Sequence, residues 1–316
     1  MTFNIPSLPF LESACDITSL SLIAALLLLS LLSLIFIFYL RLKSRSSLHL
    51  QKFNSLWTVR FLLVIFISLW GFNELLRLPF FRRGNLSTFL PHLTLKEQAN
   101  LCKIHAVLSL GFLEPGFLVT LLFLVTVSFK EKIPRGWRAI VFVFATCLPV
   151  FLLQILFLFH KKLESRFPSF SHRSWILYRT GFGDETVLCT YPLVSTILFG
   201  AFGSVYTLSF FVSCWRVVSL VINKGLRIRI YGLTFTILVA LPLQILCLGL
   251  SVMWSPEEQA YRGVELVVFL SALTCAAAGE GILVIKPIAD SLAAGGVFCH
   301  RVTPSVRLGR DIEASS

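Results

Sequence analysis

The sequence predicts an all-α, polytopic membrane protein built as a bundle of seven transmembrane helices. Hydrophobic residues make up 56% of the 316 residues and charged residues only 14%, which no ordinary soluble domain shows. Apolar runs of about 20 residues cross a hydrocarbon core of roughly 30 Å as helices. The run over residues 22–40 lacks the alternating apolarity of a membrane β-strand. The apolar runs are therefore expected to be helices.

Seven such runs occur along the chain, and no connection between them is long enough to fold alone. We expect residues 1–316 to form one seven-helix domain with a cytoplasmic tail at 287–316. The predicted spans are 17–40, 55–72, 101–128, 139–160, 187–215, 230–253 and 263–286. Five tryptophans lie at predicted span ends, where an indole suits the headgroup layer: Trp57, Trp70, Trp137, Trp215 and Trp254.

Each span carries a local signal of its own. The first is longer than a signal-peptide core and has no small-x-small site after it, so we interpret it as a retained anchor. The fourth, fifth and sixth contain Pro149, Pro192 and Pro242, which membrane helices tolerate because neighbours satisfy the freed backbone groups. The seventh repeats a small residue every four positions, which is typical of close helix packing.

Basic residues orient the bundle. The segments 41–52, 129–138, 216–229 and 286–310 each carry four Lys or Arg. By the positive-inside rule these segments face the cytoplasm, so the amino terminus is predicted outside and the carboxyl terminus inside. The net charge of +12 is then mainly a topological signal, and nucleic-acid binding is not expected.

Three cysteines fall on the predicted outer side, where disulfides form: Cys15, Cys102 and Cys189. We favour a bond between Cys102 and Cys189, with Cys15 as an alternative partner for either and three free thiols as the remaining alternative. Asn85 opens an Asn-Leu-Ser sequon on the same side and is a glycosylation candidate. Cys299 in the tail is a palmitoylation candidate, although a plain thiol explains it equally well.

Glu114 lies near the middle of the third span, in the stretch GFLEPGFLVT over 111–120. An ionised carboxylate there costs at least a few kcal/mol, so Glu114 should be protonated, paired or exposed to water inside the bundle. One interpretation is a ligand or proton site that includes His105. The other is a neutral Glu114 that only bonds a neighbouring helix, through Gln154 or Gln244.

Prolines next to this acid and in the sixth span suggest hinges. Pro115 frees a carbonyl one turn earlier in the third span, and Pro242 does so in the sixth. Glu280 in the seventh span is a second intramembrane acid, for which we favour a structural or conformational role over ligand contact. No Lys or Arg is predicted at the depth of Glu114 in another span, so an ion pair is not expected there.

The known catalytic patterns are missing from the sequence. The six histidines are scattered without metal-ligand spacing, so no metal site is expected. No Gly-rich phosphate loop and no Ser, His and acid combination is visible. We therefore predict neither an enzyme nor a cofactor.

Seven helices, an outer amino terminus and basic inner loops describe the general plan of a G-protein-coupled receptor. The common receptor motifs are absent, with VSFKEK in place of Asp-Arg-Tyr and GEGILVIKP in place of Asn-Pro-x-x-Tyr. Three stretches resemble a plant family of seven-span proteins considered candidate G-protein-coupled receptors: LWGFNELLRLPFFRR, LCKIHAVLSLGFLEPGFLVTLLFLV and PRGWRAIVFVFATCLPVFLLQ. The resemblance implies a plant plasma-membrane protein, a heterotrimeric G-protein α subunit as partner and, for some members, a melatonin-like indole as ligand.

We therefore expect a receptor-like signalling protein, in contact with membrane lipid, whose ligand enters toward Glu114. Two alternatives remain open. One is a transporter or channel that uses Glu114 and Glu280, and the other is a structural membrane scaffold in which both acids only pack helices.

Overall fold

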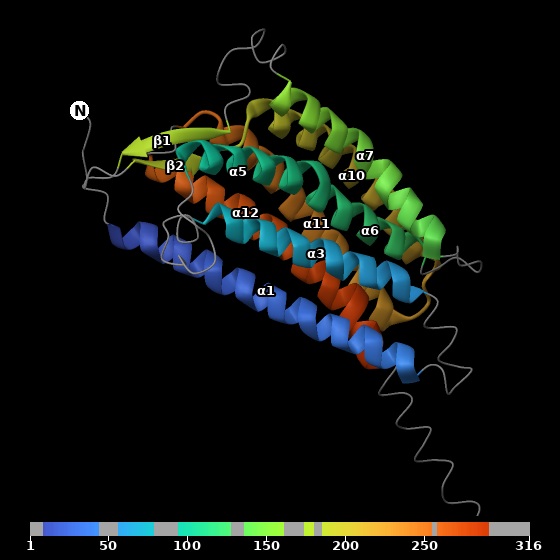
Figure 1. The fold of residues 1–316 in the computed structure, drawn as a ribbon. Helices are drawn as coiled ribbons and strands as arrows, with labels where there is room; N and C mark the ends of the chain where they lie inside the picture. Colours follow the sequence, from blue (N-terminus) through green and yellow to red (C-terminus); the bar gives the residue numbers. More distant parts are fainter. Residues whose placement is uncertain are drawn as a thin grey trace, which may run out of the picture.

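The residues that the structure describes fold as seven long apolar helices and one β-hairpin (Figure 1). The structure is a computed structural model that describes residues 9–43, 56–78, 94–127, 136–160, 174–179, 185–254 and 258–290. Each of the seven helices is long and apolar enough to cross a membrane. The predicted all-α class with seven such helices is confirmed.

The helices follow each other along the chain, and two of them contain π-helical segments. Helix α1 spans Pro9–Lys43 and α3 spans Trp57–Arg77. The third long helix comprises α5 (Leu95–Leu108), the π-helical segment η3 (Ser109–Leu113) and α6 (Glu114–Val127). The rest are α7 (Gly136–Phe159), α10 (Leu193–Leu220), α11 (Lys224–Ser251), and α12 (Gln259–Glu280) with the π-helical segment η4 (Gly281–Ile285).

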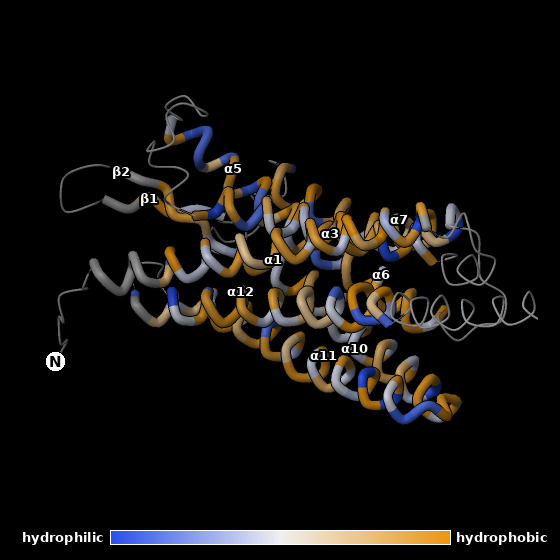
Figure 2. The backbone as a smooth tube through the Cα atoms, turned by 90° about the horizontal axis from the view of Figure 1, so that it is seen from below, coloured by the Kyte–Doolittle hydropathy of each residue, from blue (hydrophilic) through white to orange (hydrophobic). Residues whose placement is uncertain are grey.

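The third long helix is the centre of the bundle. The other six form a closed ring in the order α1, α3, α7, α10, α11 and α12, with α12 returning to α1. Inside this ring, the α5–η3–α6 helix contacts α3, α7, α10 and α12, and it is the most buried of the seven apolar helices. Apolar residues run along the bodies of the helices, and hydrophilic ones gather nearer their ends (Figure 2). A polar side chain on this central helix can therefore contact side chains of most of the surrounding helices.

One end of the bundle is covered by the hairpin. Strands β1 (Trp175–Arg179) and β2 (Glu185–Cys189) are antiparallel, with Ile176 opposite Leu188. The hairpin lies beside the start of α5 (Figure 1). Thr94 begins α5 with a capping box, in which its hydroxyl accepts from the Glu97 amide and the Glu97 carboxylate accepts from the Thr94 amide. This end is thus fixed by both strand pairing and a capped helix.

Several predicted span boundaries differ from the helix ends; the third and sixth long helices, for example, begin at Leu95 and Lys224 rather than at 101 and 230. The fifth span does not begin at 187, because residues up to Cys189 belong to β2 and α10 begins at Leu193. Pro192 is the extended residue that caps α10 rather than a residue inside it, as suits a residue without a backbone N–H. The second span continues to Arg77 rather than ending at 72.

The extended second span changes the role of Trp70. Its side chain was predicted to lie in the headgroup layer, but it is 1% exposed and stacks on Phe269, with ring centroids 5.9 Å apart. Phe117 meets the same indole edge-on at 6.3 Å. Trp70 is therefore a core residue that joins α3, α6 and α12.

Candidate functional site

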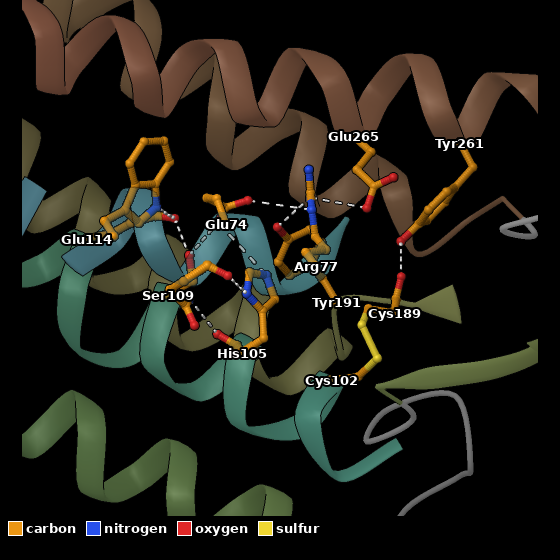
Figure 3. Close-up of polar contacts among 12 residues, drawn as sticks. Glu74, Arg77, Cys102, His105, Ser109, Glu114, Cys189, Tyr191, Tyr261 and Glu265 are labelled. Carbon is orange, nitrogen blue, oxygen red and sulfur yellow. Dashed lines mark hydrogen bonds and ion pairs between the residues drawn. A yellow bond between two sulfur atoms is a disulfide. The ribbon is translucent and has the colours of Figure 1, made fainter. Parts of the chain in front are cut away.

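A buried polar cluster runs from the hairpin end toward the middle of the bundle (Figure 3). We use the name polar cluster for eight residues: Glu74, Arg77, His105, Ser109, Glu114, Tyr191, Gln244 and Glu265. They come from α3, the central helix, the segment before α10, α11 and α12. Polar side chains inside an apolar bundle need partners, and the contacts below show how they are supplied.

Arg77 is the cation of the polar cluster. Its Nη1 lies 3.1 Å from Oε1 of Glu265, and its Nε lies 3.5 Å from Oε2 of Glu74. The same Nη1 donates to the Tyr191 hydroxyl at 2.9 Å. Arg77 therefore ties the end of α3 to α12 and to the segment that enters α10 (Figure 3).

Tyr191 accepts this hydrogen bond as a neutral phenol. Burial raises the pKa of the Tyr191 hydroxyl well above its ordinary value, and the positive charge of Arg77 opposes that rise only in part. The phenol thus adds no negative charge beside Glu74 and Glu265.

His105 lies one turn of helix from Ser109 and faces α3. Its Nδ1 is 3.1 Å from the carbonyl oxygen of Asn73, and the Asn73 amide donates back to the His105 carbonyl at 3.3 Å. Its Nε2 is 3.9 Å from Oε1 of Glu74. The predicted site residue His105 therefore belongs to the cluster and contacts α3 through Asn73 and Glu74.

Ser109 links the two halves of the cluster. Its Oγ is 3.2 Å from Oε1 of Glu74 and 2.9 Å from Oε1 of Glu114. A serine hydroxyl has one hydrogen and can donate to only one of them. Both contacts are hydrogen bonds only when one carboxyl carries a proton and donates it to Ser109. The geometry therefore suits a proton shared between Glu74 and Glu114.

The π-helical segment makes the contact between Ser109 and Glu114. In a regular α-helix, residues five positions apart point about 140° away from each other, because each residue turns the helix by about 100°. Here the Glu114 amide bonds the Ser109 carbonyl, five residues back, so one turn takes up an extra residue and aligns the two side chains. Pro115 explains the segment, since it has no N–H for the carbonyl four residues earlier.

Glu114 is held by donors from two other helices. Gln244 of α11 donates from Nε2 to Oε2 at 2.6 Å, and Trp70 of α3 donates from Nε1 to Oε1 at 3.3 Å. Glu114 is 3% exposed and forms no ion pair among the described residues. The sequence offered Gln154 and Gln244 as partners, and the structure selects Gln244.

Gln154 lies apart from the cluster. Its side chain is fully buried against Gly111, and within the described residues neither atom of its amide has a hydrogen-bond partner. It therefore faces the π-helical segment from α7 rather than the carboxylate of Glu114.

The disulfide closes the hairpin end. Cys102 on α5 is bonded to Cys189 at the end of β2, with their Cα atoms 5.1 Å apart. The Tyr261 hydroxyl approaches the Cys189 carbonyl at 3.5 Å, which adds α12 to this connection (Figure 3). The hairpin is thereby held over the helix that carries His105 and Ser109.

The other singled-out residues lie elsewhere. Pro242 is inside α11, two residues before Gln244, and Glu280 is fully buried at the end of α12. Asn85, Cys299 and the tail from residue 291 onward lie outside the described residues, whereas residues 287–290 continue the last helix. In the part of the chain that the structure describes, no group of three or more His, Cys, Asp and Glu side chains is arranged to hold a metal ion.

Five contributors to the cluster were not predicted: Glu74, Arg77, Ser109, Tyr191 and Glu265. No ion pair was expected for Glu114, and none forms among the described residues; the ion pairs of the cluster lie further along α3, where Arg77 is buried beside Glu74 and Glu265. A signal was present, since Trp70, Glu74 and Arg77 are spaced four and three residues apart, as on one face of a continuing helix. Glu265 lay inside a predicted span without being singled out.

The fold and the cluster define a class of protein: a helical protein with seven potential membrane spans and a buried ionic site at its disulfide-bonded end. The chain belongs to the family described as uncharacterised conserved protein UCP031277, which matches residues 5–298. No curated protein matches the chain.

Proposed function

We propose that this protein is a receptor-like signalling protein of the plasma membrane, with the hairpin end outside and the carboxyl terminus in the cytoplasm. Two features support this orientation: the basic segments, which by the positive-inside rule face the cytoplasm, and the disulfide, which suits an oxidising compartment. The polar cluster would receive a small ligand. The observation that carries the proposal is the bond between Glu114 on the central helix and Gln244 on α11.

The bond between Glu114 and Gln244 would connect the ligand site to α11, which reaches the opposite end of the bundle. A ligand group that competes for Glu114 would release Gln244, which lies two residues after Pro242. At its other end, α11 begins at Lys224, within the basic segment 216–229. A shift of α11 about Pro242 would change that inner surface, where a heterotrimeric G-protein α subunit is the proposed partner.

The charges of the cluster restrict the ligand. The cluster holds three carboxyl groups, from Glu74, Glu114 and Glu265, and one guanidinium, that of Arg77, which pairs with Glu74 and Glu265. The surplus of acceptors favours a ligand that brings N–H donors or a positive charge. Together with the resemblance to candidate melatonin receptors, this suggests an indole bearing a donor side chain.

Binding to the purified protein in lipid nanodiscs tests the proposal. The probes are melatonin, which is neutral, and 5-methoxytryptamine, which has the same ring and a cationic amine. We expect saturable binding that Gln244→Leu weakens at least tenfold, whereas Gln154→Leu, an equally buried glutamine outside the cluster, leaves it within twofold. Absence of saturable binding for both probes, or equal loss in the two variants, contradicts a ligand site at Glu114.

Coupling is tested separately by nucleotide exchange on a G-protein α subunit from the same tissue. We expect the bound indole to accelerate exchange in wild-type nanodiscs and not in Gln244→Leu. Binding without acceleration for any α subunit removes the coupling step while leaving the ligand site.

A transporter or channel is the alternative that the buried acids favour, because Glu114 and Glu280 lie at two levels of the bundle. Substrate or proton flux into vesicles that vanishes in Glu114→Gln supports that function. A third possibility, a structural scaffold, requires that Glu114→Gln together with Glu280→Gln leaves both binding and flux unchanged.

A further inference from the structure

Glu280 forms a second buried acidic site, at the junction of α12 with η4 and apart from the polar cluster. We propose that the Glu280 carboxyl, together with Ser30 and Ser33 of α1, is a proton-binding site between α1 and α12. The proposal does not rest on the receptor function, since it uses none of the residues of the polar cluster.

The three side chains are sealed from solvent within the protein. Glu280 and Ser33 are 0% exposed and Ser30 is 2% exposed. Ser30 Oγ donates to Oε2 of Glu280 at 3.0 Å. Ser33 lies three residues further along α1, with its hydroxyl near the same carboxyl. The serines thus occupy one face of α1, directed at α12.

Two polar atoms of this group have no partner as they stand. Among the described residues, neither Oε1 of Glu280 nor Oγ of Ser33 makes a hydrogen bond. A buried carboxylate oxygen without a donor is costly, whereas a protonated Oε1 becomes a donor. Ser33 Oγ is the acceptor that remains. One proton on Glu280 therefore satisfies both orphaned atoms.

The charges around Glu280 favour the same state. Glu74 and Glu265 share Arg77, but no Lys, Arg or His within the described residues pairs with Glu280. From α6, Leu121 packs against the neighbouring Gly279, and on α12 the nearest titratable side chain toward the polar cluster is Cys275. The Arg229–Asp290 ion pair, which joins α11 to this helix, lies ten residues beyond Glu280. An unpaired carboxylate at membrane depth is disfavoured, so the acid binds a proton instead.

The backbone next to Glu280 is not regular. Segment η4 follows it directly, with the Lys286 amide bonded to the Gly281 carbonyl five residues back, and Pro287 comes next. A wide turn beside the carboxyl allows this end of α12 to shift relative to α1. Loss of the proton would leave a charge facing α1, so we expect it to loosen the contact between the two helices.

Dicyclohexylcarbodiimide tests the proton directly in the full-length protein in nanodiscs. A buried protonated carboxylic acid adds across one C=N bond of this carbodiimide. The adduct then rearranges to a stable N-acylurea, and no group leaves. We expect peptide mass spectrometry to find Glu280 labelled, with labelling falling as pH rises about a midpoint above that of an exposed glutamate. Absence of labelling, or a midpoint equal to that of an exposed glutamate, overturns the proposal.

The serine variants sharpen the test. Ser33→Ala removes the acceptor for the protonated form and should lower the midpoint, whereas Ser30→Ala removes a donor to the ionised form and should raise it. Ser19→Ala, a buried serine elsewhere on α1, should leave it unchanged. Equal midpoints in all three variants contradict the assigned site.

Labelling in the presence of sodium distinguishes a proton site from a metal cation site. At fixed pH, replacing N-methylglucamine chloride by sodium chloride should not change labelling of Glu280. Suppression by sodium overturns the proton assignment. Glu280→Gln mimics the protonated acid and serves as the folding control. This variant should unfold like the wild type and carry no label at position 280.

Discussion

Replacing Arg77 by methionine tests whether the polar cluster holds the hairpin end of the bundle together. Methionine keeps most of the side-chain volume but removes the guanidinium. Glu74, which is 3% exposed, and Glu265, which is 24% exposed at its side chain, would then face each other without a cation. The variant should be less stable because two partly desolvated carboxylates lose their counter-charge.

The size of the loss follows from the burial of the pair. Removing one partner of a buried ion pair costs about 3–5 kcal/mol, and the partial exposure of Glu265 places Arg77→Met near the lower limit, at about 3 kcal/mol. Arg229→Met is the matched control, because its partner Asp290 has a side chain that is 50% exposed. Exposed pairs contribute only about 0.2–1 kcal/mol.

Unfolding in mixed micelles with increasing SDS measures both variants on one scale. We expect Arg77→Met to lose at least twice as much free energy of unfolding as Arg229→Met. Adding Glu74→Gln and Glu265→Gln to Arg77→Met should recover part of the loss, since no uncompensated charge remains. Equal losses in the two single variants, or no recovery in the triple variant, would refute the electrostatic account.

Three further predictions concern the central helix and its connections. Cys102→Ser should raise amide hydrogen exchange in both hairpin strands while leaving α7 unchanged, as mass spectrometry of exchanged peptides would show. Gly116→Ala should destabilise by about 1–3 kcal/mol in SDS unfolding, because its Cβ would collide with the buried ring of Phe66; Gly232→Ala, where the space is open, should be neutral or stabilising by up to about 1 kcal/mol. Pro115→Ala should let the π-helical turn close into a regular α-helix, which a crystal or cryo-electron microscopy structure of the variant would reveal.

The number and type of the long helices could be predicted, because a long apolar run indicates both that a segment is helical and that it is long enough to cross a membrane. The helix ends could not, because an apolar run becomes indistinct where several polar and charged residues follow one another. The predicted span on α3 ended before Asn73, yet Glu74 and Arg77 neutralise each other and let the helix continue inside the bundle. In this case the charges mark a site within the helix rather than its boundary.

The candidate site was predictable in part for a related reason. Glu114 is conspicuous in an apolar run, so the sequence alone singled it out, together with Gln244 as one of two partners. Ser109 carried no such signal, because serine is common in membrane helices and lies five residues from Glu114, a spacing that a regular α-helix would not bring together. Only the π-helical turn makes them neighbours, and its sequence signal is Pro115.

The two π-helical segments give the two acidic sites a common local origin. Segment η3 is followed directly by Glu114–Pro115, and η4 is followed directly by Lys286–Pro287. Each segment also adjoins a buried carboxyl, because Glu114 directly follows η3 and Glu280 directly precedes η4. The proline withholds an N–H from the preceding turn, the turn widens to a bond across five residues, and the side chains around it change direction. At Glu114 this widening supplies Ser109 as a partner, whereas at Glu280 the partners come from α1. Because each acid lies beside a turn that can tighten or widen, a change in its proton or partner would act on helix geometry at that level.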